Sequence, residues 1–233
     1  MTLNPLHTLA TSSRVLTGTT GTQGDGYFLC ADHTPPAALA GRTAPLALIN
    51  SVFARFQTPR RDPDMHAIIR ASEALQPLAE SVDSNAGLAC SFVYLTEHEG
   101  EVRYAITGKC HVVVINPDGS FEGASHEQVG RAILGDDTQA TWEPGQTLDH
   151  PPAITGARTG QQSMERGAFK AQPDSIILLV TEDSLRLLLE ENFPEKLMSS
   201  TDEFVDWAQS LLAETPGDPA NRTDGFQAML VAA

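Results

Sequence analysis

Short apolar runs bounded by turn residues recur along the chain. Runs of this kind are typical of buried β-strands. The strands predicted in this way are Tyr27–Ala31, Leu88–Leu95, Val102–Thr107, His111–Ile115, Ile176–Val180 and Phe226–Ala232. Gly100, Gly108 and the sequence Pro117-Asp118-Gly119 mark the turns of a meander within this set.

Other segments carry apolar residues at the three-to-four-residue spacing of a helix. The two longest, Leu46–Phe56 and Met65–Val82, follow one another across a Pro-Arg-Arg-Asp-Pro break, so they predict a pair of helices packed on a sheet. Further helices are predicted at Glu127–Leu134, Ser184–Asn192 and Asp202–Ala213. The stretch 136–167 is polar and rich in glycine and proline, which predicts loops.

This order of elements favours an α/β (α+β) fold of layered sheets with mostly antiparallel pairing. The chain has 233 residues, of which 41% are hydrophobic and 19% charged, enough to form a substantial core. No linker and no repeat divides the chain, so residues 1–233 are expected to form a single domain.

Charge and cysteine content limit the possible partners and surroundings. A net charge of −15 argues against binding to nucleic acid or to an anionic membrane, because both need clustered lysine and arginine. No apolar signal segment and no membrane-spanning window occurs. The three cysteines form no CxxC or zinc spacing, and reduced, buried thiols in a cytoplasmic protein are expected.

Three aspartates lie at the ends of predicted strands and carry the main indication of function. Asp32 and Asp183 follow apolar strands, and Asp224 precedes the last one. Antiparallel neighbours would bring these carboxylates to one end of a sheet, where a hard cation such as Mg²⁺ or Mn²⁺ would relieve their repulsion. The alternative is that they are turn and helix-capping residues, as aspartate often is.

The ordered set of motifs resembles the metal-dependent protein phosphatases of the 2C type, the PPM family, over almost the whole chain. The family's strand ending in Asp-Gly-x-Gly-Gly is matched by the strand that ends at Asp32. Four later family motifs are matched, in order, by Gly87-Leu88-Ala89, Gly108-Lys109-Cys110-His111, Glu182-Asp183-Ser184-Leu185 and Asp224-Gly225.

The resemblance implies a four-layer α-β-β-α sandwich, with two mostly antiparallel sheets flanked by helix pairs. It also implies a metal-dependent serine/threonine phosphatase, a hydrolase that cleaves phosphomonoesters with a hydroxide held between two Mg²⁺ or Mn²⁺ ions. The counterpart of Asp32 bridges the metals, those of Asp183 and Asp224 complete one metal site, and the backbone carbonyl of His33 is a further ligand. Asp25 retains one acid of the family's upstream acidic pair and is a candidate catalytic residue.

Three departures from the family pattern leave a second function open. The family's phosphate-binding arginine aligns with Thr20, the first upstream acid with Gly24, and the turn aspartate with Lys109. Lys109 could contact the phosphate in place of the missing arginine, or could be a solvated turn residue. The imidazole of His33 is a candidate general acid. The alternative to an enzyme is a pseudophosphatase, a binding or regulatory protein of the same fold whose partner is a phosphoprotein or a signalling protein.

Overall fold

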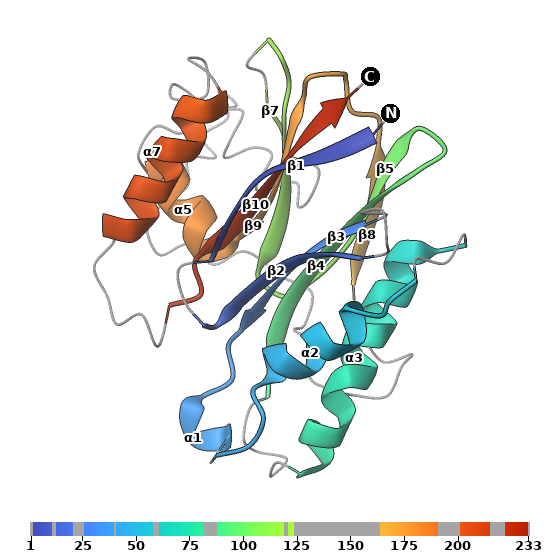
Figure 1. Cartoon of the computed structure of the whole chain (residues 1–233), viewed down its shortest axis with the longest axis vertical. Helices are drawn as coiled ribbons and strands as arrows, with labels where there is room; N and C mark the ends of the chain where they lie inside the picture. Colours follow the sequence, from blue (N-terminus) through green and yellow to red (C-terminus); the bar gives the residue numbers. More distant parts are fainter. Residues whose placement is uncertain are drawn as a thin grey trace, which may run out of the picture.

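The computed structural model describes residues 2–10, 13–20, 26–39, 41–57, 61–81, 88–118, 121–123, 164–190, 201–214 and 222–232. These residues form two five-stranded sheets (Figure 1). Every strand pairing in both sheets is antiparallel. The predicted antiparallel architecture is therefore confirmed.

The first sheet, sheet A, has the strand order β1-β10-β9-β6-β7. Its strands are β1 (Thr2–Ala10), β10 (Gly225–Ala232), β9 (Ile176–Thr181), β6 (Cys110–Ile115) and β7 (Phe121–Gly123). The second, sheet B, has the order β2-β3-β4-β5-β8. Its strands are β2 (Val15–Thr20), β3 (Gly26–Asp32), β4 (Cys90–His98), β5 (Glu101–Thr107) and β8 (Glu165–Phe169).

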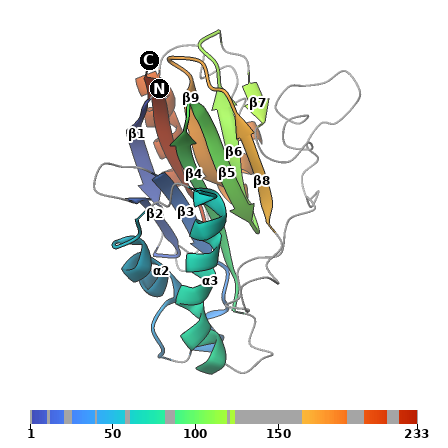
Figure 2. The ribbon, with the colours of Figure 1, turned by 90° about the vertical axis from the view of Figure 1, so that its right-hand side faces the viewer.

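Helices cover the outer face of each sheet, which gives four layers (Figures 1 and 2). A short helix, α1 (Pro36–Leu39), precedes α2 (Pro45–Phe53) and α3 (Pro63–Ser81), and the last two pack on sheet B around Phe28 and Phe92. The helices α5 (Glu182–Glu190) and α7 (Thr201–Glu214) pack on sheet A around Phe226. A third core, with Leu29 and Leu179 near its centre, fills the space between the sheets.

This arrangement explains why the strand sequences are apolar on both faces. A strand that faces helices on one side and the other sheet on the opposite side has no solvent-exposed face, so its residues need not alternate. Every residue of β3, β6 and β9 is buried. The three cysteines, Cys30, Cys90 and Cys110, are free and buried in these layers, as predicted.

Four strands lie outside the predicted set: β1, β2, β7 and β8, which are the edge strands of the two sheets. β1 contains Pro5, which its edge position tolerates, and its register against β10 shifts between Pro5 and His7. β8 falls partly in the stretch predicted as loops, and its residues are half-buried to exposed, so it lacks an apolar run. The helix predicted at Glu127–Leu134 lies outside the described residues.

The predicted turns and helix starts agree closely with the structure. Gly100 and Gly108 both have positive φ, 81° and 70°, as tight turns between antiparallel strands require. Helix α1 begins at Pro36, and proline suits the first position of a helix. Among the helices described, none has the combined length and apolarity needed to cross a bilayer.

Candidate functional site

The register of sheet B places an arginine beside the first aspartate. Val15 pairs with Ala31, and the backbone N–H of Asp32 donates to the carbonyl of Arg14 at 2.8 Å. The end of β3 is therefore held against the start of β2. Because Asp32 is only 5% exposed, its carboxylate depends on protein groups for much of its stabilisation.

The contacts of the Asp32 carboxylate come from both backbone and side chains. Its Oδ1 accepts a hydrogen bond from the backbone N–H of Thr34 at 2.9 Å, which closes a turn at the end of the strand. The Nη2 of Arg14 lies 4.0 Å from the same oxygen and donates to the carbonyl of Thr34. The Arg14 guanidinium thus stabilises the turn at Thr34 and compensates the charge of the Asp32 carboxylate.

The imidazole of His33 is held by a serine on the neighbouring strand. His33 Nε2 lies 2.7 Å from Ser91 Oγ, and Ser91 Oγ also accepts the backbone N–H of Lys109 at 2.7 Å. Burial is the main cause that lowers the pKa of His33. Lys109 also lowers this pKa, whereas Asp183 raises it. General acid catalysis would require the protonated imidazole, and this role of His33 stays a prediction.

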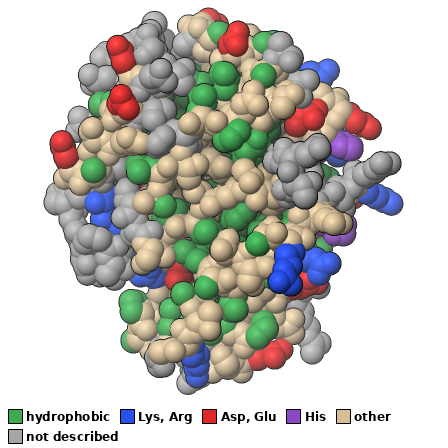
Figure 3. All heavy atoms as spheres, viewed as in Figure 1, with side chains coloured by type: hydrophobic (Ala, Val, Ile, Leu, Met, Phe, Trp, Pro, Cys, Tyr) green, Lys and Arg blue, Asp and Glu red, His purple; other side chains and the backbone are tan. Residues whose placement is uncertain are grey.

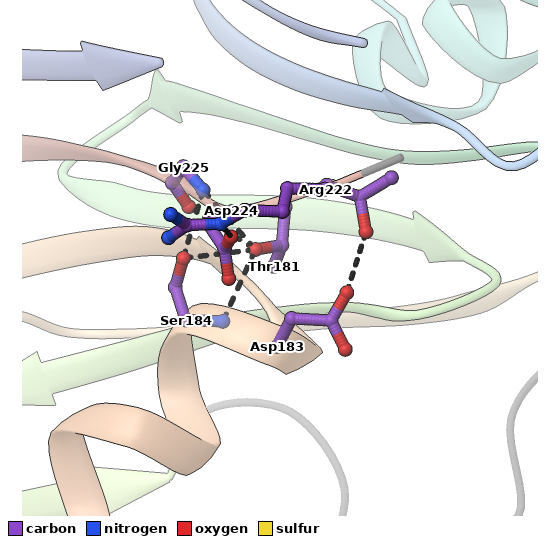
Figure 4. Close-up of polar contacts among 7 residues, drawn as sticks. Thr181, Asp183, Ser184, Arg222, Asp224 and Gly225 are labelled. Atoms are coloured by element: carbon purple, nitrogen blue, oxygen red, sulfur yellow. Dashed lines mark hydrogen bonds and ion pairs between the residues drawn. The ribbon is translucent and has the colours of Figure 1, made fainter. Parts of the chain in front are cut away.

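The second and third aspartates lie at the junction of β9, α5 and β10. Asp183 is the second residue of α5, and its Oδ2 accepts the hydroxyl hydrogen of Thr223 at 2.5 Å. Asp224 directly precedes β10, and its Oδ2 accepts from Nε of Arg222 at 2.5 Å. Figure 4 shows the carboxylate of Asp183 pointing away from the Arg222–Asp224 pair.

Short hydroxyl side chains fix this junction. The backbone N–H of Gly225 donates to Ser184 Oγ at 2.8 Å and to Thr181 Oγ1 at 3.3 Å (Figure 4). Thr181 and Ser184 are also hydrogen-bonded to each other, at 3.1 Å. The start of α5 is therefore tied to the start of β10, which brings Asp183 and Asp224 onto adjacent segments.

The sheets bring the predicted residues to one end of the sandwich. Asp32 from sheet B and Asp183 from the sheet A junction both act electrostatically on His33, as do Lys109 and Arg14. The backbone carbonyl of Lys109 accepts from the N–H of Glu182, the residue before Asp183, at 3.1 Å. We call the set Arg14, Asp32, His33, Ser91, Lys109, Asp183, Arg222, Thr223 and Asp224 the aspartate site.

The structure places one of the other residues weighed from the sequence in the core. Thr20, at the position aligned with the family's phosphate-binding arginine, is fully buried, and its Oγ1 lies 3.2 Å from the hydroxyl of Tyr94 in the core. Asp25 lies outside the described residues. Lys109 is exposed at the turn between β5 and β6, where its side chain can reach solvent.

The side chains of the aspartate site do not fit a two-metal centre in the arrangement observed. Asp183 and Asp224, the two aspartates that the resemblance assigns to one metal, point apart and are bound to Thr223 and Arg222. The carboxylate expected to bridge the metals, Asp32, has an arginine beside it. Within the described ranges, no three histidine, cysteine, aspartate or glutamate side chains come together as metal ligands would.

Arg14, Ser91, Arg222 and Thr223 are the site residues that the sequence reasoning missed. The proximity of Arg222 to Asp224 is a local signal, because the two side chains are two residues apart and point to one side of an extended segment. Arg14 gives no such signal, since the strand register brings it to Asp32 from eighteen positions earlier in the chain.

No protein-family model and no curated protein sequence matches the chain. Solved structures do match. The serine/threonine phosphatase of S. agalactiae superposes with a TM-score of 0.63 at 11% identity, covering 100% of this chain and 99% of that one. The Mycobacterium tuberculosis phosphatase PstP/Ppp gives a TM-score of 0.66 at 12% identity, covering 100% and 98%.

The PstP catalytic domain in complex with two manganese ions also matches, with a TM-score of 0.64 at 11% identity, covering 98% of this chain and 95% of that one. At such low identities these likenesses concern the architecture and not the chemistry. The chain has the fold of the bacterial 2C-type serine/threonine phosphatases, in agreement with the motifs read from its sequence.

Proposed function

We propose that this protein is a pseudophosphatase, which uses the phosphatase fold to bind a phosphorylated protein without hydrolysing it. The observation that carries the proposal is that each carboxylate of the aspartate site is already engaged by the protein itself. Asp32 faces Arg14, Asp224 is paired with Arg222, and Asp183 accepts the hydroxyl of Thr223.

Charge compensation supports this proposal. The aspartate site holds as many cationic side chains, Arg14, Lys109 and Arg222, as it holds aspartates. The Asp224 and Arg222 side chains are 6% and 14% exposed, so neither charge is well hydrated. A metal would have to displace these ion pairs, and the site would lose the attraction between their nearly buried charges.

The contact of the His33 imidazole with Ser91 supports the same conclusion. Hydrolysis of a phosphomonoester in this fold relies on a metal-held hydroxide as nucleophile. Without a metal-held hydroxide, a protein base must activate water, and His33 is a candidate for this base within the aspartate site. Its Nε2 is bound to Ser91 Oγ, whose other contact is the backbone N–H of Lys109, so this nitrogen is already engaged.

The exposed ammonium of Lys109 is the group best placed to recognise a phosphate. It lies at a turn beside His33 and lowers the pKa of that imidazole, so it is close to the aspartate site. The net charge of −15 disfavours nucleic acid as the source of that phosphate. We therefore assign the phosphate to a protein side chain.

The second candidate function is a divergent metal-dependent phosphatase. It is favoured by the oxygen-only donors Asp32, Asp183 and Asp224 at one end of a fold that, in PstP, was solved with two manganese ions. Oxygen donors of this kind suit Mg²⁺ and Mn²⁺. In this case Asp32, Asp183 and Asp224 would hold the metal ion in place of their present contacts with Arg14, Thr223 and Arg222.

An assay for Mn²⁺-dependent hydrolysis separates the two functions. The wild-type chain and Asp32→Asn are compared on a small aryl phosphate and on a phosphothreonine peptide. We expect no turnover above that of Asp32→Asn, with or without Mn²⁺. Turnover by the wild type that requires Mn²⁺ and is lost in Asp32→Asn would establish the enzyme and overturn the pseudophosphatase.

Binding is tested separately by fluorescence polarisation of a labelled phosphothreonine peptide. We expect saturable binding that is weakened about tenfold in Lys109→Ala, the loss of one charge-assisted contact. Lys170→Ala removes another exposed lysine and is the matched control. Equal affinity of Lys109→Ala and the wild type would contradict the assigned role of Lys109.

A further inference from the structure

A second cationic site lies on the helical layer of sheet B, apart from the aspartate site. It is a pocket of about 510 Å³ between the end of α2 and the start of α3, lined by Val52, Arg55, Phe56, Gln57, His66 and Arg70. We propose that this pocket binds a small organic anion, with its phosphate or carboxylate group on the arginines and an apolar part against Phe56.

The end of α2 produces the apolar floor and one of the cationic groups. The helix closes with tight turns, in which the N–H of Arg55 donates to the carbonyl of Val52 and that of Phe56 to Phe53, both at 3.1 Å. These turns direct Arg55 to solvent and Phe56 into the core, where its ring centroid lies 5.2 Å from that of Phe53. Phe56 is 8% exposed, so the part of its ring that lines the pocket is firmly held.

The facing helix supplies an imidazole and a second guanidinium group. His66 and Arg70 are four residues apart on α3 and therefore lie on one face, over successive turns. Both side chains are exposed. Figure 3 shows blue side chains, with a purple one near them, gathered over α2 and α3 on this face of the molecule.

The charges in the pocket are only weakly compensated. Arg70 donates from Nη1 to Glu73 Oε2 at 2.8 Å, an exposed pair that occupies one of five N–H donors and contributes little to stability. In the described part of the chain, no acidic side chain pairs with Arg55 or His66. The protein has a net charge of −15, whereas this pocket is lined by two guanidinium groups and an imidazole. Its local charge is therefore opposite to the net charge, which favours an anionic ligand.

The lining defines the chemistry of the ligand. Guanidinium groups bind planar carboxylates and phosphate oxygens through two parallel hydrogen bonds, and Gln57 adds an amide. Val52 and Phe56 offer apolar surface for a ring or a short chain. A volume of this size is typical of small-molecule sites rather than of an extended protein interface. The pocket shares no residue with the aspartate site, so this inference does not depend on the proposed function.

Titrations with three probes test the proposal and distinguish the two oxyanions. Phenyl phosphate, benzoate and inorganic phosphate are titrated into the full chain at constant ionic strength, with amide shifts recorded by ¹H–¹⁵N NMR. We expect saturable shifts at the α2 and α3 residues with phenyl phosphate or benzoate, and the tighter probe identifies the oxyanion. Inorganic phosphate, which lacks the apolar part, is expected to bind more weakly than phenyl phosphate.

Variants then show whether the pocket itself is responsible. Arg55→Gln and Arg70→Gln are each expected to weaken the tighter probe about tenfold, as the loss of a charge-assisted bidentate contact predicts. Arg42→Gln removes an exposed arginine outside the pocket and is expected to leave binding unchanged. No saturable shift with phenyl phosphate or benzoate, or equal weakening by Arg42→Gln and Arg55→Gln, would overturn the proposal.

Discussion

The two sheets hold their carboxylates at the same end of the sandwich in different ways. On the sheet A side, Arg222 and Thr223 contact Asp224 and Asp183 directly, both at 2.5 Å. On the sheet B side, Asp32 accepts a backbone N–H at 2.9 Å, and its arginine stays 4.0 Å away. The comparison teaches that the sheet A acids depend on side-chain partners, whereas Asp32 depends mainly on the turn that follows its strand.

The largest expected change in the free energy of unfolding comes from the ion pair on the sheet A side. Arg222→Ala removes the short ion pair of the nearly buried Asp224 carboxylate, and we expect it to lower the free energy of unfolding by about 3 kcal/mol. Urea denaturation measures this value. The double variant Arg222→Ala/Asp224→Asn, which removes the charge as well, should recover part of the loss. No recovery would mean that the ion pair is not the cause.

The next effect concerns the turn between β5 and β6, where Gly108 packs on Ser91, the partner of His33. Gly108→Ala is expected to destabilise the protein by about 2 kcal/mol, because φ there is 70° and the added Cβ would lie 2.5 Å from Ser91 Oγ. Gly100→Ala is the matched control, since it has φ of 81° but nothing within 4 Å of its Cβ position. Equal losses for the two variants in urea denaturation would show that backbone strain alone acts, and not the crowding of Ser91.

A smaller effect is expected for the arginine of the sheet B side. Arg14→Ala should lower the free energy of unfolding by only about 1 kcal/mol, because Asp32 keeps its hydrogen bond from the N–H of Thr34. Urea denaturation of Arg14→Ala and Arg222→Ala under identical conditions makes the comparison. A larger loss for Arg14→Ala than for Arg222→Ala would contradict the difference drawn between the two sheets.

The smallest effect concerns pH. Burial lowers the pKa of His33 below the value of 6.5 that it has when exposed, so the unfolded chain binds this proton more readily. The resulting stability is fully present above pH 6.5 and is lost as the pH falls below that value. We expect the urea midpoint of the wild type to fall more steeply from pH 7 to pH 5 than that of His33→Gln. Parallel profiles would contradict a buried neutral imidazole.

Particular residues show how far the sequence could predict this molecule. The runs that became β3, β6 and β9 were recognisable because every residue in them is buried, and the glycines of the tight turns marked the hairpins. β8 was not predicted, because a half-exposed edge strand has no apolar run. The sequence pattern therefore predicted the inner strands of both sheets and missed the four edge strands, β1, β2, β7 and β8.

The site was predicted to a lesser extent, for a physical reason. The positions of Asp32, Asp183 and Asp224 follow from strand ends, which local pattern reveals. The place of Arg14 follows from the β2–β3 register, and the direction of the Asp183 side chain follows from its bond to Thr223. Neither is encoded in local spacing, so the sequence located the acids without showing what compensates them.

Calorimetric titration with Mn²⁺ tests most directly whether arginines, and not metal ions, balance the aspartate site. The wild type is compared with Arg14→Ala/Arg222→Ala, a double variant that removes the arginine beside Asp32 and the arginine paired with Asp224, at a temperature where circular dichroism shows both proteins to be folded. The account predicts no saturable heat of Mn²⁺ binding to the wild type, and binding that appears in the double variant. Saturable binding of two ions to the wild type, lost in Asp32→Asn, would contradict it.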